Sequence, residues 1–139
     1  MNLVTDCSFI MSSILPDENQ SGVEDIYNDI ANNTYKVYVP SVFYLECNNV
    51  LLSSLKRNRI TQKNYDDYLD LLSVLPICID NFCATPESLY MMRNLSTKYG
   101  LTSYDSSYLE VAIRMKASIA TLDKKLATIC KDINVQLVL

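Results

Sequence analysis

Two aspartates end apolar runs of the sequence that predict buried strands. Asp6 closes the run "NLVTD" (residues 2–6), and Asp123 closes the run "SIATLD" (residues 118–123). Ligands of a parallel sheet bind beyond the carboxyl ends of its strands, so we expect both aspartates at one edge of one sheet. Each also has a purely structural alternative, because Asp6 can cap a turn and Asp123 is a suitable helix N-cap.

Two more acidic residues lie on the apolar faces of predicted helices. Glu46 has a valine four residues away on either side, and Asp105 shares a helical stripe with Tyr108 and Leu109. A carboxylate is costly to bury unless it is paired or bound. The structural alternatives are that Asp105 caps its helix and that Glu46 pairs with a buried basic group.

Four carboxylates that meet in one pocket favour a bound metal ion. Like charges repel one another and raise each other's pKa unless a cation joins them. Ligand sets made only of oxygen favour Mg²⁺ or Mn²⁺, and such ions promote phosphodiester hydrolysis. The sequence therefore predicts a Mg²⁺ or Mn²⁺ site whose metal-binding and catalytic residues are Asp6, Glu46, Asp105 and Asp123.

Two other acidic groups are left out of this predicted site. Asp66 and Asp70 are four residues apart in "YDDYLDLL", which is typical of a solvated helix face. Glu110 is expected to pair with Arg114 on the polar face of its helix, because residues four apart are neighbours on a helix.

Missing residue types exclude most other catalytic chemistries. The chain has no histidine, which excludes Ser-His and Cys-His catalysis and histidine zinc sites. Its two glycines, Gly22 and Gly100, are too few for a dinucleotide-binding turn or a P-loop. If the protein is an enzyme, carboxylates and a metal must do the work.

Cysteine usage and hydropathy predict the compartment. The five cysteines are scattered and form no CxxC pair, which favours reduced, buried thiols. No apolar run approaches the roughly 18 residues of a membrane span, and the start "MNLVTDCSFI" lacks the basic region of a secretory signal. We therefore expect a cytoplasmic protein without membrane contact.

The net charge of −4 argues against generic binding of nucleic acid, which usually requires a basic surface. Two divalent ions would balance this charge, and local basic clusters matter more than the total. Such clusters are "KRNR" (Lys56, Arg57 and Arg59) and the pair Lys124 and Lys125 after the fourth acid. The alternative for both is a solvated helix end.

Strand and helix patterns alternate along the chain. Predicted strands cover residues 2–6, 36–40, 77–80, 118–123 and 135–139, and predicted helices cover residues 22–32, 42–57, 62–75, 85–99, 105–115 and 124–132. Ser41 and Thr61 are expected N-caps, and Gly100 is an expected helix end. This order predicts one α/β domain, residues 1–139, built as a three-layer sandwich around a central parallel sheet of about four or five strands.

Four segments of the sequence, which together cover nearly the whole chain, resemble the PIN-domain ribonucleases and, within them, the VapC-type toxins of bacterial toxin-antitoxin pairs. The segments are "VTDCSFI", "VPSVFYLECNNVL", "GLTSYDSSYLEVAIRM" and "IATLDKKLATICKDINVQLV". The resemblance places the family's acidic quartet on Asp6, Glu46, Asp105 and Asp123. It also implies that Ser8 and Thr121 support the carboxylates.

This PIN-like resemblance implies a Mg²⁺- or Mn²⁺-dependent endoribonuclease toxin that cuts structured RNA such as tRNA or rRNA. It further implies a cognate VapB-like antitoxin as partner, and a homodimer. One alternative is a catalytically inactive PIN-fold module that docks a basic protein partner. Another is phosphoryl transfer through an aspartyl intermediate on Asp6, although Ser8 stands where haloacid-dehalogenase-like enzymes carry a second aspartate.

Overall fold

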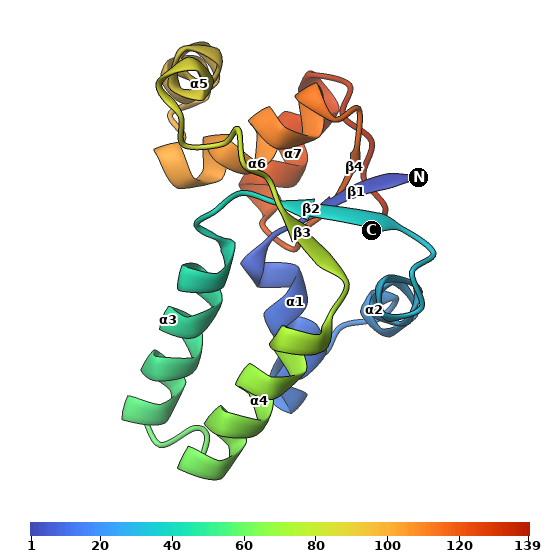
Figure 1. Cartoon of the computed structure of the whole chain (residues 1–139), viewed down its shortest axis with the longest axis vertical. Helices are drawn as coiled ribbons and strands as arrows, with labels where there is room; N and C mark the ends of the chain where they lie inside the picture. Colours follow the sequence, from blue (N-terminus) through green and yellow to red (C-terminus); the bar gives the residue numbers. More distant parts are fainter.

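Four parallel strands form the central sheet in a computed structural model that describes residues 1–139 (Figure 1). The strands are β1 (Asn2–Thr5), β2 (Lys36–Val39), β3 (Ile77–Ile79) and β4 (Ser118–Ala120), in the order β3, β2, β1, β4. The prediction of a parallel sheet of four or five strands is therefore confirmed.

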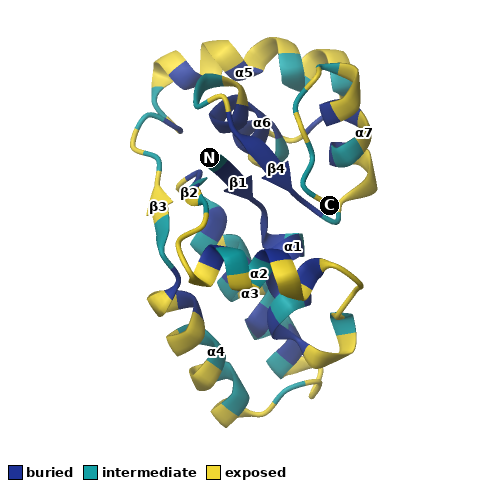
Figure 2. Ribbon diagram, turned by 90° about the vertical axis from the view of Figure 1, so that its right-hand side faces the viewer, coloured by how far each residue is buried: buried dark blue, intermediate teal, exposed yellow.

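Burial explains why these runs are strands. β1 and β4 are almost wholly buried because helices cover both of their faces (Figure 2). β3 lies at the edge of the sheet, and Cys78 and Ile79 are exposed there.

The predicted fifth strand at residues 135–139 is wrong. Only an isolated bridge pairs Leu137 with Ile119 of β4, through hydrogen bonds from Ile119 N to Gln136 O and from Val138 N to Ile119 O. β4 has only three residues, so a segment beside it finds little backbone to pair with.

Helices cover both faces of the sheet, which confirms the three-layer sandwich (Figures 1 and 2). One layer contains α5 (Pro86–Tyr99), α6 (Ser103–Arg114) and α7 (Lys124–Asp132); the other contains α1 (Cys7–Ile14), α2 (Val23–Ala31), α3 (Phe43–Lys56) and α4 (Gln62–Val74), with a short 3₁₀ turn, Pro16–Glu18, after α1. None of these helices combines the length and apolar character that crossing a bilayer requires.

Helix ends follow local side-chain chemistry in most places. Thr61 and Thr85 cap α4 and α5, and Gly100 ends α5 with a left-handed φ of 61°. The expected N-cap Ser41 is wrong, because Val42 is the N-cap of α3. The alternative that Asp105 caps α6 is also wrong. The N-cap of α6 is Thr102, whose hydroxyl accepts a hydrogen bond from the Asp105 amide at 3.1 Å.

Helix α1 is absent from the sequence-based prediction. Six of its eight residues, in "CSFIMSSI", are buried. It therefore lacks the polar face that would reveal a helical period. The helix matters for function because it begins directly after Asp6.

Candidate active site

Asp6 is held rigidly at the point where β1 passes into α1. It is the N-cap of α1, and its Oδ1 accepts hydrogen bonds from Phe9 N at 3.0 Å and from Ser8 Oγ at 2.7 Å. Its Oδ2 accepts a hydrogen bond from Thr121 Oγ1. The carboxylate is buried, so the local capping role and the placement at the sheet edge coincide.

Ser8 and Thr121 also connect the ends of β1 and β4. The Leu122 amide donates to Ser8 Oγ at 3.0 Å, and the Asp123 amide donates to Thr121 Oγ1 at 3.0 Å. Both hydroxyls therefore contact the Asp6 carboxylate and the chain leading to Asp123. This is the supporting arrangement expected from the sequence.

Glu46 projects from the first turn of α3 and is half-buried. Its Oε1 accepts a hydrogen bond from Tyr108 Oη at 3.0 Å, and no basic side chain pairs with it, so the buried ion pair considered as an alternative is wrong. Burial and the nearby Glu46 carboxylate raise the pKa of Tyr108, which keeps the phenol protonated as a donor.

Asp105 and Asp123 are more accessible to solvent. Asp105 lies in the first turn of α6, and its carboxylate makes no hydrogen bond or ion pair in this structure. Asp123 is the N-cap of α7, and its Oδ1 accepts a hydrogen bond from Leu126 N at 2.9 Å. Asp123 therefore caps a helix, which is the structural alternative considered from the sequence.

The four carboxylates influence one another electrostatically. Burial raises the pKa of Asp6 against the lowering effect of its hydrogen bonds, and the charge of Asp123 raises it further. Burial also raises the pKa of Glu46, and the charges of Asp105 and Asp6 add to this shift. Residues from four separate parts of the sequence thus form one acidic site, and no lysine or arginine forms an ion pair with any of them.

The chemistry of this donor set fits a hard divalent cation. All four side chains offer carboxylate oxygens, and Asp105 has both of its oxygens free. No three acidic side chains of the chain lie close enough together in this structure to hold an ion between them. The structure thus brings the four residues to one edge without forming a closed coordination shell.

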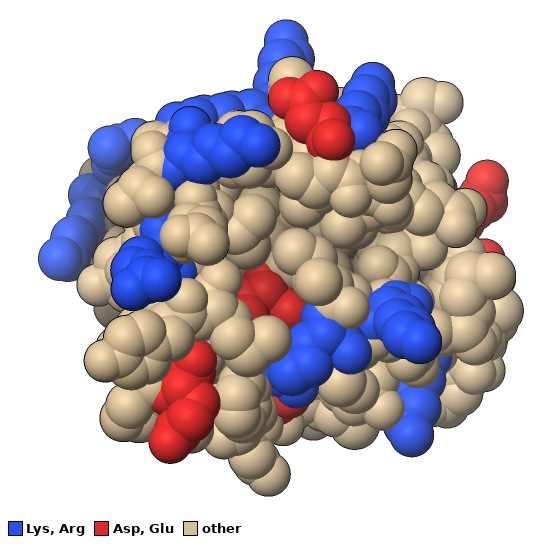
Figure 3. All heavy atoms as spheres, turned by 90° about the horizontal axis from the view of Figure 1, so that it is seen from above, with Lys and Arg blue, Asp and Glu red and all other residues tan.

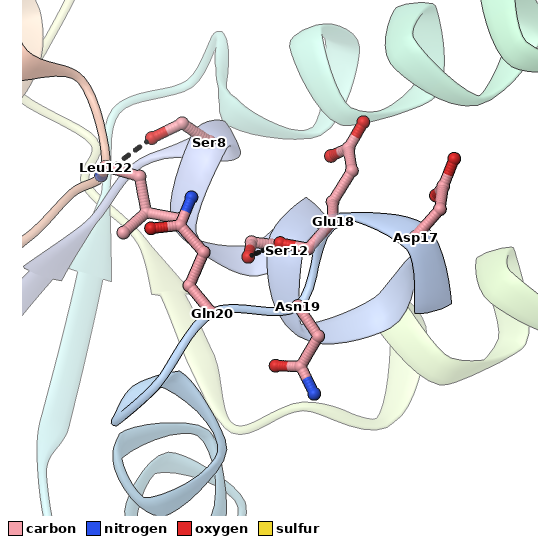
Figure 4. A pocket seen from close by; sticks show the side chains of 7 residues that line it. All are labelled: Ser8, Ser12, Asp17, Glu18, Asn19, Gln20 and Leu122. Atoms are coloured by element: carbon pink, nitrogen blue, oxygen red, sulfur yellow. Dashed lines mark hydrogen bonds between the residues drawn. The ribbon is translucent and has the colours of Figure 1, made fainter.

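A polar cavity of about 390 Å³ adjoins this site (Figure 4). Its lining is Ser8, Ser12, Asp17, Glu18, Asn19, Gln20 and Leu122. In Figure 4 the Gln20 side chain extends toward Ser8 and Leu122, whereas the Asp17 and Glu18 side chains point away from them. No sequence pattern predicts this cavity, because residues 15–22 show no periodicity.

Arg59 and Glu110 differ from the sequence-based expectations. Arg59 forms ion pairs with Asp17 at 2.6 Å and Glu18 at 3.1 Å, so it is not a free member of the basic cluster "KRNR". Glu110 does pair with Arg114, at 2.6 Å, but it is buried rather than on a polar face. Arg114 also bonds Asp80 at 2.6 Å, and Asp80 follows β3, a partner that local helix spacing cannot reveal.

Comparisons with known proteins agree with this fold. The PIN domain family model matches residues 3–132. No curated protein sequence shows significant similarity to the chain.

Three solved structures share the fold at low sequence identity. PAE2754 from Pyrobaculum aerophilum is 20% identical with a TM-score of 0.68, over 92% of this chain and 86% of that one. VapC20 from Mycobacterium tuberculosis, described as a sarcin-ricin loop cleaving toxin, is 10% identical with a TM-score of 0.67, over 91% and 94%. VapBC2 from Rickettsia felis, bound to a DNA fragment from its promoter, is 16% identical with a TM-score of 0.66, over 99% and 96%.

Proposed function

The chain belongs to the PIN domain family, and on that premise we propose that it is a metal-dependent endoribonuclease, the toxin of a VapC-type toxin-antitoxin pair. The observation that carries the proposal is the acidic edge of the sheet. There, Asp6, Glu46, Asp105 and Asp123 influence one another and lack basic partners. Such a site favours a divalent cation and a polyanionic substrate.

The four carboxylates would hold Mg²⁺ or Mn²⁺, which when bound stabilises the charge that develops on a phosphodiester. Ser8 and Thr121 orient Asp6 and favour its ionised form, because each donates a hydrogen bond to a different carboxylate oxygen. Tyr108 binds Glu46 Oε1 and leaves Oε2 free.

The partners we propose are a structured RNA substrate such as tRNA or rRNA, a VapB-like antitoxin and a second copy of the chain, all in the cytoplasm. Two of the structural neighbours support this proposal, since one is described as a sarcin-ricin loop cleaving toxin and another as VapBC2 bound to a DNA fragment from its promoter. An apolar groove of about 290 Å³ beside Asp105, lined in part by Leu45, Leu89 and Tyr104, supports a protein partner.

The test is RNA cleavage by the purified chain with Mg²⁺ or Mn²⁺. We expect cuts at discrete positions in a structured RNA, and we expect EDTA to stop them. Asp105→Asn should reduce the rate at least about 100-fold while the fold is kept, because the variant removes a ligand charge without removing a structural contact. Asp66→Asn, which neutralises an exposed carboxylate on α4, is the matched control. Full cleavage by Asp105→Asn would contradict the proposed roles.

A second candidate is the inactive PIN-fold module that docks a basic protein partner. One observation favours it, namely that no three acidic side chains are already arranged to hold an ion. Calorimetric titration of the folded protein with Mg²⁺ and Mn²⁺ separates the two candidates. Uptake of either ion supports the nuclease, and no uptake of either supports the binding module.

A further inference from the structure

We propose that the exposed face of α7 binds the phosphate backbone of the RNA substrate. The residues that carry this inference are Lys124, Lys125 and Lys131 of α7, together with Lys98 near the end of α5. We call these four residues the basic stripe. The inference rests on the proposed nuclease function and adds where the substrate lies relative to the acidic site.

Charge is distributed unequally between the two halves of the molecule. Residues 1–79 contain ten acidic and five basic residues, whereas residues 80–139 contain six acidic and seven basic residues. In the second half, Asp80 and Glu110 are already bound to Arg114. Figure 3 looks onto the α5–α7 side, where lysine and arginine side chains are spread over the face with acidic side chains between them.

The geometry of α7 arranges its lysines for contact with an extended polyanion. Lys124, Thr128 and Lys131 follow a helical spacing of four and three residues and are all exposed, while Leu126 and Ile129 face the core. Lys124 and Lys131 are separated by about 10 Å along the helix axis. No residue of the basic stripe forms an ion pair, so their charges are free to bind phosphate.

The basic stripe begins at the acidic site. Lys124 directly follows Asp123, whose charge raises the pKa of Asp6. Lys125 Nζ donates to the Gly100 carbonyl at 3.0 Å, which places its charge at the turn between α5 and α6. Gly100 lies two residues after Lys98 and two residues before the N-cap of α6, Thr102. Positive charge therefore borders the acidic site on the α7 side.

RNA fits this face better than an acidic protein segment does. Protein interfaces contain a core of aromatic and apolar side chains, but α7 exposes no large hydrophobic side chain. Backbone phosphates need only cations and hydroxyl groups, which Lys124, Thr128 and Lys131 supply.

The experiment measures RNA binding without cleavage. The probe is a fluorescein-labelled RNA hairpin, and its anisotropy is followed in EDTA at several salt concentrations. Lys124→Ala/Lys131→Ala should weaken binding about 25-fold at 0.1 M salt and reduce the salt slope by about 1.4, if each lysine neutralises one phosphate in the single-stranded loop of the hairpin. Lys56→Ala/Lys63→Ala, which makes the same charge change on α3 and α4, should bind nearly as the wild type does.

Three results would overturn the inference: equal losses in the two double variants, no loss in the α7 variant, or failure of the charge-preserving Lys124→Arg/Lys131→Arg variant to bind as wild type. The same variants are also titrated with labelled poly-L-glutamate. A loss confined to that probe would assign the stripe to an acidic protein instead. Binding is measured in EDTA, which prevents metal-dependent cleavage. A chain that binds RNA through α7 in EDTA but does not cut it when Mg²⁺ or Mn²⁺ is present refutes the nuclease proposal alone.

Discussion

Thr121 stabilises the Asp6 carboxylate across 115 positions of sequence, and this single contact makes the acidic site depend on the pairing of β1 with β4. The Thr121 hydroxyl also accepts the Asp123 amide at 3.0 Å, so one side chain positions two of the four acids. Thr121 is buried, and water cannot replace its hydroxyl group.

Thr121→Val should weaken Mg²⁺ affinity about 10- to 100-fold, because the Asp6 carboxylate loses the donor that orients it. The measurement is calorimetric titration of the folded variant. Thr128→Val is the control, since the Thr128 hydroxyl donates only to the Lys124 carbonyl on the exposed side of α7. Equal Mg²⁺ affinity in wild type and Thr121→Val would show that Thr121 does not support the site.

At this scale the sequence predicted which residues approach one another but not all of their contacts. Glu46 lies on an inward-facing stripe as expected, but its partner is the hydroxyl of Tyr108, 62 positions away, rather than a basic group. Tyr108 was identifiable only as a stripe neighbour of Asp105. Such pairings depend on how α3 and α6 pack across the sheet edge, which local spacing does not specify.

Helix α6 is held to the end of β3 by a buried ion network. Arg114 bonds Glu110 within the helix and Asp80 beyond the strand, and its guanidinium lies 4.6 Å from the Phe82 ring centroid. Glu110 and Asp80 raise the pKa of Arg114, so the guanidinium stays charged. This network fixes the helix that carries Asp105.

Arg114→Leu should lower the free energy of unfolding by about 3 to 5 kcal/mol, because it leaves the buried Glu110 carboxylate without its partner. Urea denaturation measures the change. Arg59→Leu breaks two exposed ion pairs and should lower the free energy of unfolding far less, because solvent screens exposed pairs. Similar losses in the two variants would mean that the Arg114 network contributes no more than a surface ion pair.

Elements with a clear amphipathic period or strong cap were predictable, and short buried ones were not. Thr61, Thr85 and Gly100 mark their helix ends because each acts on backbone groups within a few residues. Helix α1 was missed because its buried sequence shows no polar face, and Val42 rather than Ser41 caps α3 although serine is the better N-cap by chemistry. The tertiary structure overrides local preference at both positions.

For the whole molecule, the alternation of strands and helices predicted a parallel three-layer sandwich, but not the strand order β3, β2, β1, β4. That order results from packing between distant elements. It places β1 between β2 and β4, so that Asp6 lies at the centre of the edge where Glu46, Asp105 and Asp123 arrive. The difference in charge between the α1–α4 layer and the α5–α7 layer likewise becomes visible only when each helix is assigned to a face of the sheet.

The stability of the whole molecule should depend on pH and on metal through the same carboxylates. Burial raises the pKa of Glu46, so the folded chain binds that proton more tightly than the unfolded chain, whose glutamate has a pKa of about 4.3. The resulting stabilisation is fully present below the unfolded pKa and is lost as the pH rises through the folded pKa. In EDTA, Glu46→Gln should therefore be more stable than wild type at pH 7, and this advantage should disappear near pH 4.

At pH 7, Mg²⁺ should make wild type more stable than Glu46→Gln. A ligand at 100 times its dissociation constant stabilises the folded state by about 2.7 kcal/mol, and Glu46→Gln, which lacks one of the four ligand charges, should bind Mg²⁺ more weakly and gain less. Thermal unfolding of wild type and Glu46→Gln, with and without Mg²⁺, measures both effects, and the exposed Glu24→Gln controls for a lost charge. If wild type is more stable than Glu46→Gln in EDTA at pH 7, burial of the ionised Glu46 carboxylate does not destabilise the folded chain. A bound cation would then have no such cost to offset.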